Sequence, residues 1–103
     1  MTGEQQCNEE REELFKAYAR FETLHRLFFE LDERAGNLIA EAEAAIAAGD
    51  EDRSHRLWAE AVANIQAAQE IFTLADEARA AMDEIWHGYL ACRHEQEAAE
   101  VPS

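Results

Sequence analysis

Residues 14–45, LFKAYARFETLHRLFFELDERAGNLIAEAEAA, decide the fold of this chain. Their apolar side chains recur at alternating intervals of three and four residues, which keeps them on one side of an α-helix. A repeat of 3.5 residues sustained in this way is typical of long helices that pack side by side at a shallow angle. Ten consecutive positions follow it without a break: Leu14, Ala17, Phe21, Leu24, Phe28, Leu31, Ala35, Leu38, Ala42 and Ala45.

The same helix has recognisable ends. Asn8 is a suitable N-cap ahead of a run of glutamates, and Gly49 suits the position just beyond the C-terminal end. Gly36 lies inside the repeat, but the spacing continues through it, and one glycine in a helix costs only about 1 kcal/mol relative to alanine. We therefore expect one continuous or kinked helix over about residues 8–48, rather than a break at Gly36-Asn37.

A second helix is predicted to follow at once, over about residues 51–97. Asp50 is a suitable N-cap, and two further acids, Glu51 and Asp52, stand in the first turn, where carboxylates are favourable. The apolar stripe of this helix is expected to contain Leu57, Ala61, Ile65, Ala68, Phe72, Ala75, Met82, Ile85 or Trp86, and Tyr89.

The connection between the two helices, at about residues 49–50, is short, and short connections join antiparallel neighbours. The predicted fold class is therefore all-α, an antiparallel hairpin of two long helices forming a single domain over residues 1–103, with a frayed tail at 98–103. The composition agrees, because the 103 residues include 21 alanines but only 4 glycines and 1 proline. The turn residues that punctuate all-β and α/β folds are missing, so both classes are excluded.

The charge narrows the range of partners. With 23 acidic and 9 basic side chains the formal net charge is −14, so we expect no direct binding to nucleic acid or to an anionic membrane surface. No run approaches the roughly 18 apolar residues that a membrane span needs. The first residues are polar and acidic, unlike a signal peptide. We therefore expect a cytoplasmic protein.

Two cysteines stand near the two ends of the chain. Counted from a turn near residue 50, Cys7 is level with about His94, within a couple of residues of Cys92. In a reducing cytoplasm we expect two thiols that pack as small side chains. The alternative is a redox-sensitive bond that joins the chain ends.

One hairpin cannot bury all the large apolar side chains of this sequence. Contiguous apolar surface on a protein marks an interaction site, and symmetric dimers dominate among soluble oligomers. We therefore expect two copies to form a four-helix bundle. The predicted interface residues are Phe15, Tyr18, Leu27, Phe29, Ile39, Ile46, Trp58, Val62, Trp86 and Tyr89.

These features predict a non-enzymatic, homodimeric protein–protein interaction module that binds another protein as an adaptor, small chaperone or regulator. The sequence has no Gly-rich phosphate loop, nucleophile elbow or Cys-x-x-Cys motif, so we expect no catalytic residue and no cofactor. An alternative function comes from five acids without a base near the turn. They form a solvated face, or they let the chain act as a nucleic-acid mimic that inhibits a DNA- or RNA-binding protein such as a defence nuclease. These acids are Glu41, Glu43, Asp50, Glu51 and Asp52.

Two Glu-x-x-His motifs, Glu22/His25 and Glu84/His87, give a second alternative. Residues three apart share one helix face, and this spacing resembles the motifs with which ferritin-like proteins hold a metal pair inside a four-helix bundle. The resemblance implies a dimetal-binding helical dimer. At 100° per residue, however, both glutamates lie away from the apolar stripes, and the two motifs are several residues apart in register. We therefore expect exposed side chains rather than a metal site.

Overall fold

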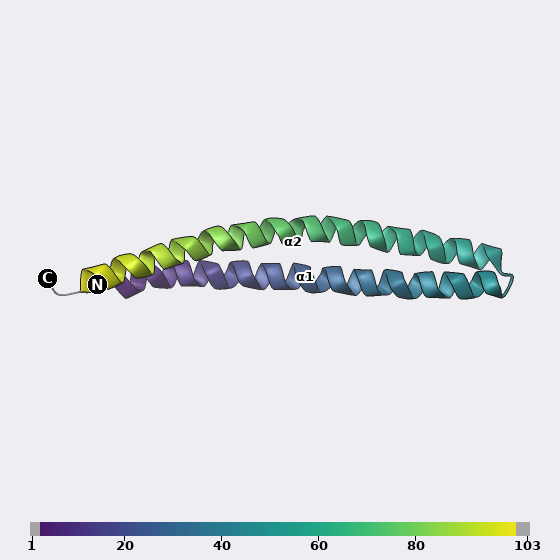
Figure 1. Ribbon diagram of the computed structural model, residues 1–103, viewed down its shortest axis with the longest axis horizontal. Coiled ribbons are helices and arrows are strands. Elements are labelled where there is room, and N and C mark those ends of the chain that lie inside the picture. The colour runs from purple at the N-terminus through teal and green to yellow at the C-terminus, as the bar shows by residue number, and fades with distance from the viewer. Residues whose placement is uncertain (1–2, 101–103) are drawn as a thin grey trace. The chain divides into compact units, whose positions relative to one another are not determined.

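The computed structural model describes residues 3–100, with side chains for residues 7–98. Helix α1 (Gly3–Ala47) and helix α2 (Glu51–Glu100) are joined by one short turn, and no strand occurs in the described range. The helices lie side by side and antiparallel, so their described ends are neighbours (Figure 1). The predicted all-α hairpin is confirmed, and α1 continues through Gly36 without a break.

The packed side of α1 has the predicted 3.5-residue repeat. All ten predicted positions are buried or half-buried, and Cys7 and Glu10 extend the same spacing toward the start of the helix. Among residues 7–47 only Ile39 is half-buried outside this row. We call the row on each helix that faces the other helix its seam. The strict spacing of the seam is what lets two long helices remain in contact over many turns.

The seam of α2 differs from the prediction at two positions. Seven predicted residues are buried or half-buried, with Ile85 rather than Trp86 at the alternative position, whereas Ile65 and Phe72 are exposed. The seam takes the preceding residues, Asn64 and Ile71, because only these keep the three-four spacing. The full row is Ser54, Leu57, Ala61, Asn64, Ala68, Ile71, Ala75, Ala78, Met82, Ile85, Tyr89, Cys92 and Gln96.

The helix ends extend beyond the predicted limits. Asn8 is not an N-cap, because α1 already begins at Gly3, and the seam contacts of Cys7 hold the chain before Asn8 in the helix. Helix α2 continues to Glu100, so residues 98–100 of the predicted tail are helical. The remainder of that tail, residues 101–103, lies outside the described residues.

The turn is built from paired caps, as the sequence predicts. Gly49 has a positive φ of 82°, its N–H donates to Ile46 O at 3.0 Å, and the Asp50 N–H donates to Ala45 O at 2.9 Å. These two bonds are the Schellman pattern that satisfies the last carbonyls of a helix. Asp50 then caps α2, because its Oδ1 accepts from the Arg53 N–H at 3.1 Å. The chain therefore reverses direction over residues 48–50.

Gly36, inside α1, and Gly49, in the turn, give a matched pair of stability predictions. Gly36→Ala should raise the free energy of unfolding by about 0.5–1 kcal/mol, because a Cβ at this helical position meets no atom within 4 Å. Gly49→Ala should lower it by about 1 kcal/mol, because φ is positive there. Urea denaturation of both variants measures the difference; equal effects of the same sign would contradict the helix through Gly36.

The chain divides into two compact units, each with a part of both helices. Unit 1 joins the start of α1, up to Thr23, to α2 from Ala75 onward, and unit 2 is Leu24–Leu74 with the turn. In unit 2 the helices are linked by Ser54, which is fully buried and donates its hydroxyl to Ala42 O at 2.9 Å. No helix in the described part of the chain has an apolar stretch that could cross a membrane.

Candidate interaction surface

A shallow apolar groove lies between the helices in unit 1. It has a volume of about 440 Å³ and is lined by Leu14, Phe15, Tyr18, Met82, Asp83 and Trp86. Phe15, Tyr18 and Trp86 each stand one position after a seam residue, so both helices turn the same flank to this side of the hairpin. We call this hollow the aromatic groove.

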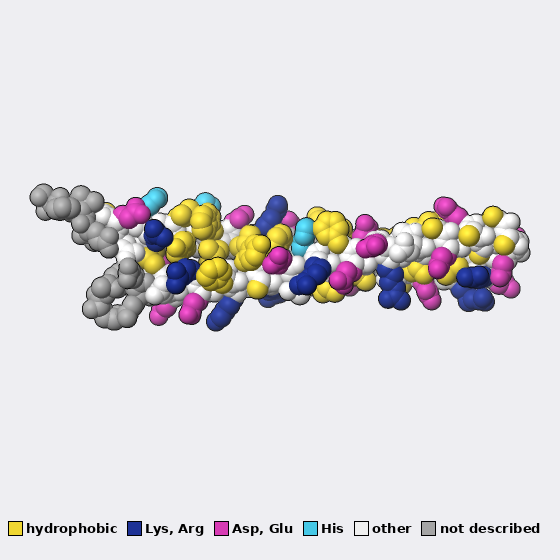
Figure 2. All heavy atoms as spheres, turned by 90° about the horizontal axis from the view of Figure 1, so that it is seen from below, with side chains coloured by type: hydrophobic (Ala, Val, Ile, Leu, Met, Phe, Trp, Pro, Cys, Tyr) yellow, Lys and Arg dark blue, Asp and Glu magenta, His cyan; other side chains and the backbone are white. Residues whose placement is uncertain are grey.

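The aromatic groove is open to solvent although it is made of large apolar side chains. Phe15 is 64% exposed, Tyr18 49% and Trp86 43%. Figure 2 shows hydrophobic side chains gathered on one face next to the described chain ends, with both basic and acidic side chains around them. Three exposed aromatic residues around one hollow are unusual for a surface without a partner.

The opposite side of unit 1 is chemically different. The groove there is lined by seam residues and by the residues that precede them, and most of these are charged or small: Glu13, Lys16, Ala17, Arg20, Glu77, Ala78, Ala81 and Ile85. Among the described residues of unit 1, the large exposed apolar side chains are thus confined to one of the two sides.

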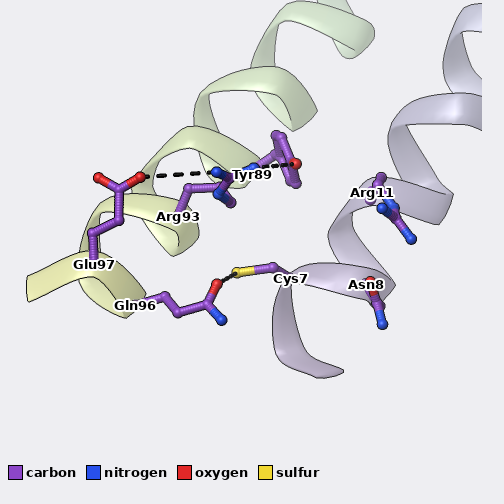
Figure 3. Close-up of a pocket in the computed structure, with 7 residues that line it drawn as sticks. All are labelled: Cys7, Asn8, Arg11, Tyr89, Arg93, Gln96 and Glu97. Atoms are coloured by element: carbon purple, nitrogen blue, oxygen red, sulfur yellow. Dashed lines mark hydrogen bonds and ion pairs between the residues drawn. The ribbon is translucent and has the colours of Figure 1, made fainter. Parts of the chain in front are cut away.

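A polar pocket of about 580 Å³ lies beside the described chain ends (Figure 3). On α2, Arg93 lies between Tyr89 and Glu97: it donates to Tyr89 Oη at 3.1 Å and lies 3.8 Å from Glu97 Oε1. Arg11 lies across the pocket on α1, and Gln96 extends toward Cys7. The pocket is therefore lined on the α2 side by a chain of contacts within one helix.

Cys7 and Cys92 form a disulfide across the two helices, with their Cα atoms 5.8 Å apart. The expectation of two free thiols is therefore wrong, and the alternative of a bond between the chain ends is the one observed. Gln96 Oε1 lies 3.4 Å from Cys7 Sγ; it could accept from the thiol, whereas the bonded sulfur has no proton to donate. One seam position further along α1, Glu10 Oε2 is buried without a hydrogen-bond partner, which is a cost to stability.

Unit 2 also carries aromatic side chains on the flank that follows the seam. The ring centroids of Phe28 and Phe72 lie 5.4 Å apart. The ring centroid of Phe29 lies 5.6 Å from that of Phe28 and 4.8 Å from that of His25. Large exposed apolar residues on this flank of unit 2 are Phe29, Ile46, Trp58, Val62, Ile65 and Phe72.

The predicted interface residues do not all lie on one surface. Leu27, 40% exposed, precedes seam residue Phe28 and so lies on the other side of the seam from Phe29. Ile39 is half-buried, and Tyr89 is a half-buried seam residue that contacts Arg93. The remaining seven predicted residues are exposed on the flank that follows the seam: Phe15, Tyr18, Phe29, Ile46, Trp58, Val62 and Trp86.

The four candidate metal ligands remain separate. Glu22, His25, Glu84 and His87 are all exposed. Within the described residues, no group of three or more histidine, cysteine, aspartate or glutamate side chains is placed to hold a metal ion.

The five acids near the turn are exposed and belong to unit 2. Asp50 has a structural task, because its carboxylate caps α2. Among the described residues, none forms an ion pair with Glu41, Glu43, Glu51 or Asp52, which is the arrangement expected of a solvated acidic face.

Fold and surface define an antiparallel two-helix hairpin with a disulfide between its ends and an open aromatic groove. Comparison of the chain with protein-family models, curated proteins and solved structures gave no match.

Proposed function

We propose that this chain is a non-enzymatic protein–protein interaction module that acts as a homodimer, with the aromatic groove as its dimer interface. The observation that carries the proposal is the exposure of Phe15, Tyr18 and Trp86 around one apolar hollow. Burying one such side chain fully contributes roughly 1.5–3 kcal/mol. These side chains are already partly covered in the hairpin, so each gains a part of this amount, and a second copy contributes the same three side chains.

The charge around the groove favours a second copy of the chain as the partner. Two molecules with a net charge of −14 repel each other, and they approach most easily through their least charged side. On the groove side of unit 1, three arginines stand against four carboxylates, a net charge of −1. These residues are Arg11, Glu22, Asp76, Arg79, Asp83, Arg93 and Glu97.

Sedimentation equilibrium of the untagged protein tests the proposal. We expect a mass of twice 11.7 kDa for the unchanged chain and of 11.7 kDa for the double variant Phe15→Ser, Trp86→Ser. The double variant removes apolar area mainly from the groove, because neither side chain belongs to the seam, although the Trp86 ring also lies 5.9 Å from the ring of the seam residue Tyr89.

Leu27→Ser is the matched control. Leu27 is an exposed apolar residue on the other side of the seam, so the variant should keep the dimer mass. A monomeric unchanged chain at all concentrations, or a dimer that persists in the Phe15, Trp86 double variant, would overturn the proposal.

The role of the dimer is proposed from the same surface. With the grooves covered, the outer acidic side chains are what another protein meets, which suits an adaptor, small chaperone or regulator with a basic partner. A cytoplasmic location stays a prediction of the sequence, and the disulfide argues against it, because disulfides persist mainly in oxidising compartments.

A further inference from the structure

On the groove side of α1, a positive and a negative side chain lie at equal distances on either side of Phe15 and Tyr18. Arg11 stands four residues before Phe15, and Glu22 stands four residues after Tyr18. All four side chains are exposed, and each follows a seam residue by one position, so they lie in one row on the groove side of unit 1. The midpoint between Phe15 and Tyr18 is also the midpoint between the arginine and the glutamate.

The groove flank of α2 has the same centre. Cys7 and Cys92 are level, with Cα atoms 5.8 Å apart. The midpoint of the α1 row lies nine and a half residues after Cys7, and the midpoint between Arg79 and Trp86 lies nine and a half residues before Cys92. Arg79 and Trp86 also follow seam residues by one position. On both helices, therefore, these residues are arranged symmetrically about the same level of unit 1.

We infer that two copies pair with their groove faces antiparallel, about a two-fold axis that runs across the hairpin at this level. This inference rests on the proposed homodimer and specifies its geometry. The axis places α1 on α1 of the second copy, so that Phe15 meets Tyr18 and Arg11 meets Glu22, each pair occurring twice. On α2 it brings Arg79, which is paired with Asp76 in its own hairpin, to the level of the Trp86 ring of the second copy, where a cation–π contact is favourable.

The parallel arrangement lacks these contacts. A two-fold axis along the helices would place α1 on α2 of the second copy at the same level. Arg11 would then face Trp86 and Leu90, and Glu22 would face the region of Asp76 and Arg79, which already form an ion pair at 3.0 Å. No acid would stand opposite Arg11. The charges on the groove side therefore favour the antiparallel pair.

One residue, Asp83, opposes the antiparallel arrangement. Asp83 lines the aromatic groove and stands within one residue of the axis, so it faces Asp83 of the second copy. Like charges that face each other weaken an interface. In the parallel arrangement Asp83 would instead be level with Lys16 of its own hairpin and would face the Phe15–Tyr18 row, with no acid opposite.

A charge exchange on α1 tests the geometry by sedimentation equilibrium. Arg11→Glu alone and Glu22→Arg alone should each weaken the dimer roughly tenfold, because each variant replaces two attractive pairs by two repulsive ones. The double variant Arg11→Glu, Glu22→Arg should return the affinity to within roughly threefold of the unchanged chain. Both substitutions are at exposed positions, and far-UV circular dichroism of all three variants checks that the helices remain.

Asp83→Asn is the independent test, and it should tighten the dimer roughly threefold. Glu84→Gln, the neighbouring exposed acid off the groove, is the matched control and should leave the affinity unchanged. The antiparallel geometry is overturned if the losses of affinity from Arg11→Glu and Glu22→Arg add up in the double variant and Asp83→Asn has no effect. If Phe15→Ser with Trp86→Ser still disrupts the dimer in that case, the proposed function stands. An unchanged chain that is monomeric overturns both.

Discussion

Loss of the Cys7–Cys92 bond is expected to lower the free energy of unfolding by about 4 kcal/mol. The bond links residues 85 positions apart, and closing so long a loop removes much of the conformational entropy of the unfolded chain. A chain of 103 residues has a total stability on the order of 5–15 kcal/mol, so the effect is a large share of it. Guanidinium denaturation with and without a thiol reductant, at one protein concentration, measures the change.

The variant Cys7→Ala, Cys92→Ala separates the bond from side effects of the reductant. It should unfold as the reduced protein does, and reductant should not change it further. Alanine is the better replacement at Cys7, because that side chain is only 5% exposed and serine would bury a hydroxyl. Two free thiols per chain in the purified, unreduced protein, or a shift below about 1 kcal/mol on reduction, would count against the bond.

Loss of the bond should act locally. The disulfide holds the two segments of unit 1 together, whereas unit 2 contains the turn, which joins its helices directly. Amide hydrogen exchange in the reduced protein should therefore rise most in the segments up to Thr23 and from Ala75 onward. Equal loss of protection in Leu24–Leu74 would show instead that the two units unfold together.

The fold could be predicted because its signals are local and repeated. Ten positions of α1 follow one spacing, so the predicted seam of α1 agrees with the structure. Gly49 ends α1 and Asp50 caps α2, so the predicted turn agrees as well. On α2 the prediction preferred the larger apolar residues Ile65 and Phe72. The spacing itself determines the seam there, and it places a polar residue, Asn64, in the row.

Other features could have been found by extending the repeat. Seven residues before Ala61, the spacing reaches Ser54, the buried hydroxyl that links the helices of unit 2. Seven residues before Leu14, it reaches Cys7, which places the thiol in the seam and favours the bond to Cys92. The aromatic groove was harder to predict from the sequence. It depends on which flank of each helix lies on the same side of the hairpin, and only the antiparallel register decides that.

Ala61→Leu is expected to lower the free energy of unfolding by about 2 kcal/mol through overpacking. Ala61 is fully buried in the seam of α2, and the seam of α1 in the same unit also contains buried alanines, with Ala35 2% exposed and Ala42 0%. Alanines in the seams of both helices let the backbones approach closely, and a leucine at Ala61 must displace one helix or leave its preferred rotamer.

Ala63→Leu provides the matched control for this prediction, because it makes the same change two residues away on the same helix, at an exposed position. Its effect should stay within about 0.5 kcal/mol, since both residues are strong helix formers and nothing is displaced. Thermal or urea denaturation of the two variants gives the difference directly. Equal effects at both positions would mean that the helices of unit 2 are not in close contact at Ala61, and the alanine-lined seam would then not be what holds this unit together.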